Sequence, residues 1–169
     1  MSSHLWPLLR LEAENEDALK EAYRLVYLET YVRAKDGRRV EIYDWLGNRI
    51  FFHAGTFEHA FSESDNYRFS YGIHQHFSVR RARCMLWIHE VLAASKGTIE
   101  RRHQMRKDSR GRLKKRRALI VVEEKYVVVL EERKKRGEFD FVTAFSADFA
   151  YLEKLRRESA LLEIKKPQS

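Results

Sequence analysis

The sequence predicts an α+β fold in which helices cover an antiparallel sheet. Three successive segments late in the chain carry the strand signal. Residues 118–122 and 126–130 are apolar runs rich in β-branched residues, and residues 139–145 alternate between two unlike faces. The joint between the last two runs is short and contains Gly137, and only antiparallel strands can be joined so tightly. We therefore expect an antiparallel meander over residues 117–147.

Helical periodicity marks the segments that can cover this sheet. Residues 12–33, 77–94 and 148–163 each place apolar residues three and four positions apart, which is the spacing of an amphipathic helix. Residues 39–52 indicate a β-hairpin, because two strand-like runs flank a turn that contains Gly47. A chain of 169 residues is long enough to bury a core of its own. We expect one domain over residues 1–169.

The charge of the chain indicates the class of its partner. Lys and Arg number 33 against 25 Asp and Glu, which gives a net charge of +8. An excess of this sign favours a polyanion, with nucleic acid ahead of an anionic membrane surface. No segment has the roughly 20 consecutive apolar residues that cross a bilayer, so we expect no membrane-spanning segment.

The basic segment 101–117 is the strongest single signal, because ten of its seventeen residues are Lys or Arg. We expect a mobile basic loop or the tip of a long hairpin. Charge of one sign repels itself in the free protein, and bound phosphates relieve that repulsion. Few apolar residues interleave, which favours contact with the phosphate backbone over base reading. With the turn after residue 132, the predicted nucleic-acid contacts are Arg101, Arg102, Arg106, Lys107, Arg110, Arg112, Lys114, Lys115, Arg116, Lys134, Lys135 and Arg136.

Cysteine usage limits both the chemistry and the compartment. Cys84 is alone, so it forms no internal disulfide or multi-cysteine zinc site, and it fits a reducing environment. Residues 1–20 lack the pattern of a secretory signal, and we expect a cytoplasmic protein. Cys84 lies beside the apolar stripe of a predicted helix, which is typical of a buried thiol and not of a nucleophile. No Gly-rich phosphate loop occurs, so no nucleotide cofactor is expected.

Five histidines raise the question of a metal site: His53, His59, His74, His76 and His89. Two of them, His74 and His76, would point to one face of a strand, as some metal sites require. The sequence contains no HExxH motif, no cysteine pair and no carboxylate at a ligand spacing. Scattered core or surface histidines explain this set better. We expect no metal and no cofactor.

A proton-transfer site is the third candidate. His59 belongs to the irregular segment 53–76, and histidine can take or give a proton near neutral pH. The hydroxyl of Thr143 and a cation from Arg81 or Arg117 could hold a phosphate while negative charge builds on its oxygens. Both residues also have an interpretation without catalysis. His59 can bridge a loop to the core, and Thr143 can be an ordinary strand residue that shares one face with the three Phe residues of its strand.

Four stretches in this order resemble one ribonuclease group. HAFSES (59–64), FSVRRARCMLWI (77–88), YVVVLEE (126–132) and FDFVTAFS (139–146) are similar to the barnase–EndoU–colicin–RelE (BECR) group of metal-independent ribonucleases, and most similar to its phage- and prophage-associated branch. The resemblance implies helices followed by an antiparallel sheet of four or slightly more strands, with the cleft on the sheet. It also implies a catalytic set of His59, Arg81, Arg117 and Thr143. No second histidine lies in the meander, so the general acid has no assignment.

The resemblance implies an endoribonuclease that leaves a 2′,3′-cyclic phosphate and a 5′-hydroxyl. A structured RNA such as a tRNA is a plausible target, and such enzymes often act as toxins with an inhibitor or antitoxin protein. One alternative is a non-catalytic RNA- or DNA-binding domain, which needs the basic segment but neither His59 nor Thr143. Another is a basic protein-interaction module with an acidic protein partner.

Overall fold

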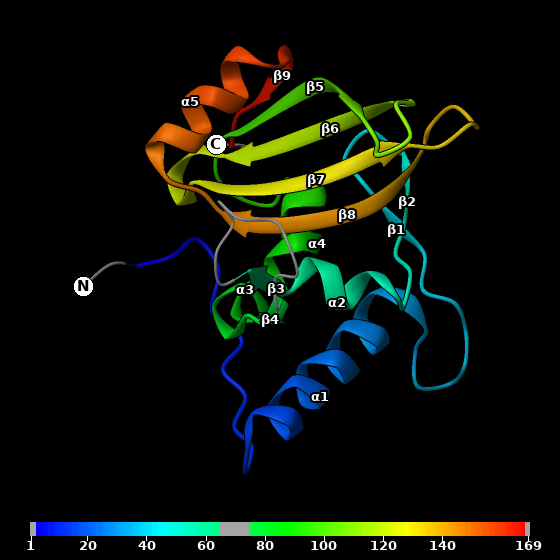
Figure 1. The fold of residues 1–169 in the computed structure, drawn as a ribbon, viewed down its shortest axis with the longest axis vertical. Helices are drawn as coiled ribbons and strands as arrows, with labels where there is room; N and C mark the ends of the chain where they lie inside the picture. Colours follow the sequence, from blue (N-terminus) through cyan, green and yellow to red (C-terminus); the bar gives the residue numbers. More distant parts are fainter. Residues whose placement is uncertain (1–2, 65–74, 168–169) are drawn as a thin grey trace.

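A curled seven-stranded sheet organises the chain (Figure 1). The computed structural model describes residues 3–64 and 75–167. Neighbouring strands of the large sheet are antiparallel, apart from the parallel pair β2 and β8. The predicted α+β class and its antiparallel meander are confirmed, but the sheet is larger than expected. In spatial order it contains β1 (Ile42–Tyr43), β2 (Arg49–Phe51), β8 (Glu138–Ser146), β7 (Tyr126–Glu132), β6 (Leu113–Val121), β5 (Ile99–Lys107) and β9 (Ala160–Lys165).

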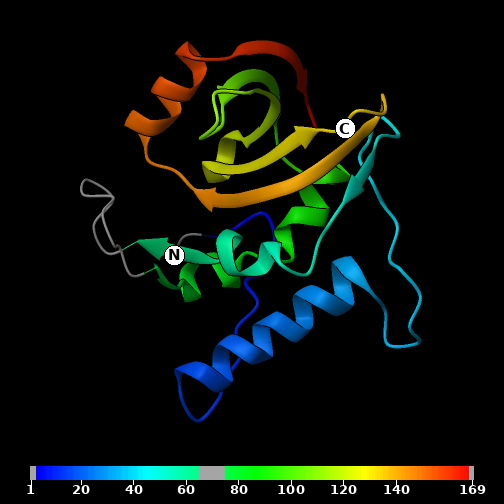
Figure 2. The same cartoon turned by 45° about the vertical axis from the view of Figure 1, so that its right-hand side comes forward.

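Helices cover both faces of the sheet (Figures 1 and 2). On one face the aromatic side chains of the N-terminal half of the chain pack against the strands and form the larger core. On the other face a smaller core lies under α5 and contains Leu152, Leu155, Ile120 and Val127. None of the described helices is long and apolar enough to cross a membrane. The helices are α1 (Glu16–Tyr27) with a π-helical turn at Leu28–Val32, α2 (Thr56–Ala60), α3 (Val79–Arg83), α4 (Trp87–Leu92) and α5 (Phe149–Arg157), beside the two-stranded sheet of β3 (Ser62–Ser64) and β4 (Gln75–Phe77).

The predicted helix over residues 77–94 is in fact two short helices with a break at residues 84–86. Two tyrosine hydroxyls from other elements donate hydrogen bonds to backbone carbonyl groups at the break. Tyr31 donates to the Met85 carbonyl at 2.7 Å, and Tyr126 donates to the Cys84 carbonyl at 3.3 Å. Buried backbone groups need partners, and these hydroxyls supply them where the helical ladder stops. The predicted helix over residues 12–33 begins later, at Glu16, because the Asn15 side chain caps it.

The predicted C-terminal helix is correct only in its first part. Asp148 caps α5, which ends at Arg157, and residues 160–165 instead form the edge strand β9. Arg102 of β5 is buried at this junction. Its guanidinium donates to Ser159 Oγ at 2.9 Å and to the Arg156 carbonyl at 3.2 Å. A tertiary contact therefore ends the helix although its apolar spacing continues.

The basic segment is a long hairpin, which was one of its two predicted forms. β5 pairs with β6 over nine residue pairs from Ile99↔Val121 to Lys107↔Leu113, and β9 pairs with the other side of β5. Asp108 forms the turn by accepting from the backbone N–H of Arg110 and Arg112. Gly111 has a φ of +76°, a left-handed conformation that glycine adopts without strain. Most of the positive charge therefore lies on rigid strands.

A β-bulge divides β8 into two halves that face different cores. Val129 pairs with Thr143 but Leu130 pairs with Phe141, so Val142 is an extra residue in the strand. Phe141 lies in the larger core, whereas Phe145 packs against the smaller core under α5. The prediction that Thr143 shares its face with all three Phe residues of the strand is wrong. The bulge turns Thr143 toward the α5 side.

Candidate nucleic-acid interface and active site

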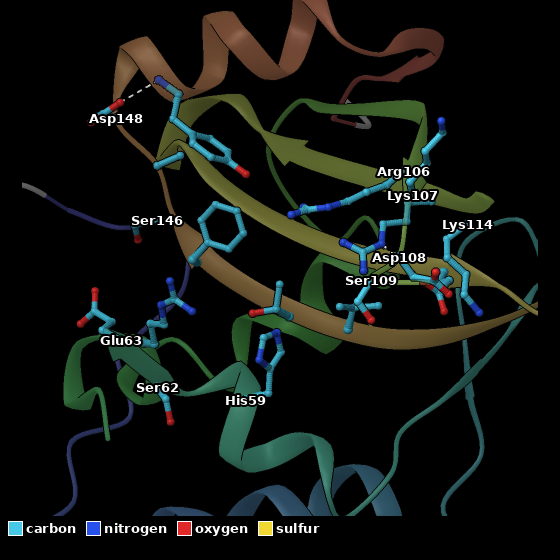
Figure 3. Close-up of a pocket in the computed structure, with 18 residues that line it drawn as sticks. His59, Ser62, Glu63, Arg106, Lys107, Asp108, Ser109, Lys114, Ser146 and Asp148 are labelled. Carbon is cyan, nitrogen blue, oxygen red and sulfur yellow. Dashed lines mark hydrogen bonds and ion pairs between the residues drawn. The ribbon is translucent and has the colours of Figure 1, made fainter. Parts of the chain in front are cut away.

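A cavity of about 900 Å³ opens on the α5 side of the sheet (Figure 3). Its floor is formed by adjacent strands, with Arg116 from β6, Glu131 from β7 and Thr143 from β8. The first turn of α5, the β5–β6 hairpin and the α2–β3 segment surround this floor. The structure thus brings three predicted site residues, His59, Arg81 and Thr143, to one cavity.

His59 reaches the cavity because half of β8 is an open sheet edge. β2 pairs only with residues 138–140 of β8, and α2 contacts β8 beside that uncovered edge. His59 lies on α2 with its side chain exposed, and Figure 3 shows the ring pointing toward β8. No hydrogen bond or ion pair joins its ring to another described residue. The imidazole can therefore exchange a proton with a ligand.

Arg81 enters the cavity from α3, whose first turn is capped by Ser78. Its guanidinium carbon lies 5.4 Å from the centre of the Phe145 ring, a cation–π contact that fixes its direction. Burial lowers the pKa of Arg81, but an arginine begins so high that it stays protonated at neutral pH. Its Nε is buried with no partner among the described residues. A half-buried cation with donors to spare suits an anionic ligand.

Thr143 places a hydroxyl on the floor of the cavity. Its Oγ1 is buried and has no hydrogen-bond partner among the described residues. A buried polar atom without a partner costs roughly 1–3 kcal/mol. A phosphate oxygen in the cavity could accept from this hydroxyl.

Two carboxylates of the cavity differ in their surroundings. Burial alone would raise the pKa of Glu63, but hydrogen bonds from Ser78 (2.6 Å) and Arg80 outweigh it and lower the pKa. Glu63 is thus an ionised carboxylate that holds Ser78 and Arg80 in place. Glu131 pairs with Arg116 on the floor through a longer Nε–Oε1 contact of 3.5 Å. The sequence analysis missed Glu131, although it lies at the end of a predicted strand, where site residues often occur.

Cations of the hairpin line the remaining wall. Arg106, Lys107 and Lys114 line the cavity together with Arg116, and all four belong to the predicted nucleic-acid set. Arg116 is paired with Glu131, whereas the other three have no ion pair within the described part of the chain. In Figure 3, Arg106 and His59 approach the cavity from opposite sides. The wall therefore offers positive charge that no acid among the described residues pairs with.

Arg117 does not reach the cavity. Side chains alternate along a strand, so Arg117 lies on the face opposite to Arg116. There it donates to Glu132 at 2.9 Å, lies 2.6 Å from His103 Nδ1, and sits 5.4 Å from the centre of the Phe139 ring. Of these two neighbouring arginines, Arg116 lines the cavity, and Arg117, which the resemblance implied for the catalytic set, does not.

The other predicted contacts fall into three groups. Arg101 pairs with Glu163 at 3.3 Å and Arg102 is buried, so both contribute to the fold. Lys115 is exposed on the face opposite to the cavity. The turn of β5–β6 and the turn of β7–β8 lie at the same end of the sheet, in agreement with one basic surface (Figure 1). These two turns carry Arg110, Arg112, Lys134, Lys135 and Arg136.

No protein-family model, curated protein or solved structure matches this chain. The function is therefore argued from the cavity and its residues.

Apart from His59, none of the described histidines lines the cavity. His53 Nε2 is 2.8 Å from Asp140 Oδ1, and His89 Nδ1 is 3.6 Å from Glu90. His76 belongs to β4, and His74 is outside the described residues. Within residues 3–64 and 75–167, no group of three or more His, Cys, Asp or Glu residues could hold a metal ion.

Proposed function

We propose that this cavity binds RNA and cleaves it without a metal ion. The observation that carries the proposal is the meeting of His59, Arg81 and Thr143, from three distant elements, in one cavity with unpaired cations. RNA supplies its own nucleophile. The 2′-hydroxyl oxygen bonds to phosphorus, the 5′-oxygen leaves, and the products are a 2′,3′-cyclic phosphate and a 5′-hydroxyl. The protein need supply only a base, an acid and cations.

The surroundings of each group suggest its role. Glu131 is a carboxylate held on the floor of the cavity by Arg116, and in this proposal it accepts the proton of the 2′-hydroxyl. The imidazolium form of His59 then protonates the leaving 5′-oxygen. Arg81 and Arg116 face the non-bridging oxygens, where charge builds in the transition state, and Thr143 donates a further hydrogen bond. The sequence analysis leaves the general acid without an assignment. This proposal gives that role to His59 and gives the role of the base to Glu131.

The test is cleavage of tRNA by the purified protein in EDTA, with sequencing of the cleaved ends. His59→Ala should lower the rate about 10²–10⁴-fold, the usual contribution of a positioned acid or base. RNA binding should persist, because the cations are unchanged. His53→Ala is the matched control, since this exposed histidine pairs with Asp140 outside the cavity. If His59→Ala cleaves as fast as wild type, the site is wrong.

The role of Glu131 has a test of its own. Glu131→Gln should lower cleavage about 10²–10⁴-fold, as His59→Ala does, because each variant removes one of the two groups proposed to move a proton. If Glu131→Gln cleaves as fast as wild type, Glu131 is not the base.

A non-catalytic RNA-binding domain is the second candidate. It is favoured by the unpaired Arg106, Lys107 and Lys114, which bind phosphates whether or not chemistry follows. Salt-dependent binding without cleavage under any condition would establish this alternative. We also propose, from the resemblance alone, that the enzyme acts as a toxin and has an inhibitor protein as its partner.

A further inference from the structure

A second cavity lies beside the first, between β5 and α5. It has a volume of about 400 Å³, and it shares Arg106, Lys107 and Tyr151 with the first cavity. Lys154 and Glu158 line it from α5. The two cavities are thus adjacent, and the side chain of Tyr151 contributes to both.

Tyr151 is held as an exposed aromatic surface. Its side chain is 43% exposed, and its ring packs edge-on against Phe145 at 5.3 Å and 87°. Its backbone N–H donates to the capping carboxylate of Asp148 at 2.8 Å (Figure 3). A ring fixed by a neighbouring aromatic and by its own helix cap loses little conformational freedom when a ligand stacks on it.

Charge around the second cavity matches a phosphate. Arg106, Lys107 and Lys154 supply three positive charges against the single acid Glu158. None of the three cations has an ion pair within the described part of the chain. Lys154 lies three residues after Tyr151 on α5, so both side chains project from the same helix face. An aromatic ring next to unpaired cations is the arrangement that binds a base together with its phosphate.

We propose that the two cavities hold consecutive nucleotides of a single-stranded RNA segment, with one base stacked on Tyr151 and its phosphate bound by Arg106, Lys107 and Lys154. This inference rests on the proposed function and deepens it by naming the form of the substrate. In a duplex the bases are stacked on one another and cannot reach a protein ring, so the segment is a loop, an end or another unpaired stretch.

The experiment measures binding without cleavage. A fluorescently labelled 2′-O-methyl RNA of about six nucleotides carries phosphates and bases but no nucleophile, and the same sequence as a duplex is the comparison. Tyr151→Ala should weaken binding of the single strand about 10- to 100-fold and leave duplex binding unchanged. Tyr151→Phe should bind as wild type, because the ring is retained.

Phe149→Ala is the control, since this residue is a 65% exposed aromatic on the same helix and lines neither cavity. Its binding should equal that of wild type. If Tyr151→Ala binds the single strand as tightly as wild type, the second site is refuted, even where the protein cleaves RNA. If binding depends on Tyr151 but no RNA is cleaved, the second site stands and only the cleavage proposal fails.

Discussion

Arg102 and Arg106 lie four residues apart on one face of β5, and the structure assigns them opposite roles. Arg102 donates to Ser159, to the Arg156 carbonyl and to Glu100 at 2.9, 3.2 and 3.2 Å. Hydrogen bonds from a charged donor contribute about 1.5–3 kcal/mol each, and breaking a buried ion pair costs about 3–5 kcal/mol. Glu100 keeps its 2.6 Å contact with Arg156, so its charge is not left unpaired. We therefore expect Arg102→Gln to cost about 2–4 kcal/mol.

At this chain length 1 kcal/mol shifts the melting temperature by about 2–4 °C, so Arg102→Gln should melt roughly 5–15 °C lower. Below its transition it should still bind RNA with the salt dependence of wild type. Arg106→Gln should leave the melting temperature almost unchanged and should alter RNA binding instead. Its exposed charge contributes within about 0.5 kcal/mol to stability, but the log–log salt slope of binding should fall by about 0.7 for one lost phosphate contact. Calorimetry measures the melting temperature, and a salt titration of RNA binding measures the slope. Equal effects of the two substitutions on either measurement would refute the division of roles.

Three further predictions follow from burial and strand faces. Trp87 is 2% exposed and donates to the Pro7 carbonyl at 3.0 Å, so Trp87→Ala should cost about 3–5 kcal/mol in denaturant unfolding; an unchanged midpoint would contradict a core role. Lys114→Ser should reduce the salt slope by about 0.7 and Lys115→Ser should not, because the two neighbours lie on opposite faces of β6; a loss in both would place both at the interface. Burial raises the pKa of Cys84 to about 11, so at pH 8 a thiol reagent should react with it far faster in denaturant than in the native protein, and rapid native labelling would show an accessible thiolate.

Local patterns were sufficient for the central strands. Residues 118–121 of the first apolar run are buried in β6, and the run at 126–130 is buried in β7, whereas Val122 is exposed and follows β6. The composition of a fully buried strand is enough to predict it. These two inferences use residues that are close in sequence. The expectation that His59 and Thr143 belong to one site came instead from the resemblance, because the two residues are far apart in the sequence.

Features set by distant partners could not be predicted. β5 is rich in arginine and reads as a loop, yet it lies between β6 and β9, which pair along both of its edges. α5 stops where Arg102, more than fifty residues earlier in the chain, donates to the Arg156 carbonyl and to the Ser159 hydroxyl. Glu131 and Tyr151 became site candidates only when the fold brought them to a shared cavity.

The bulge at Val142 has a consequence for how β8 tolerates substitution. When every residue of a regular strand is substituted in turn, folding is sensitive at every second position, because alternate side chains face the core. Here polar substitutions should be harmful at Phe139, Phe141 and then Ala144, because the sensitive positions change phase where the extra residue is inserted. Thr143 lies between the core positions Phe141 and Ala144 and borders the cavity, so it can vary for function with little effect on folding. Phe145 also borders the cavity but packs against the smaller core, so a polar substitution there should be harmful as well. At Thr143, selection can therefore act on the cavity almost independently of the stability of the protein.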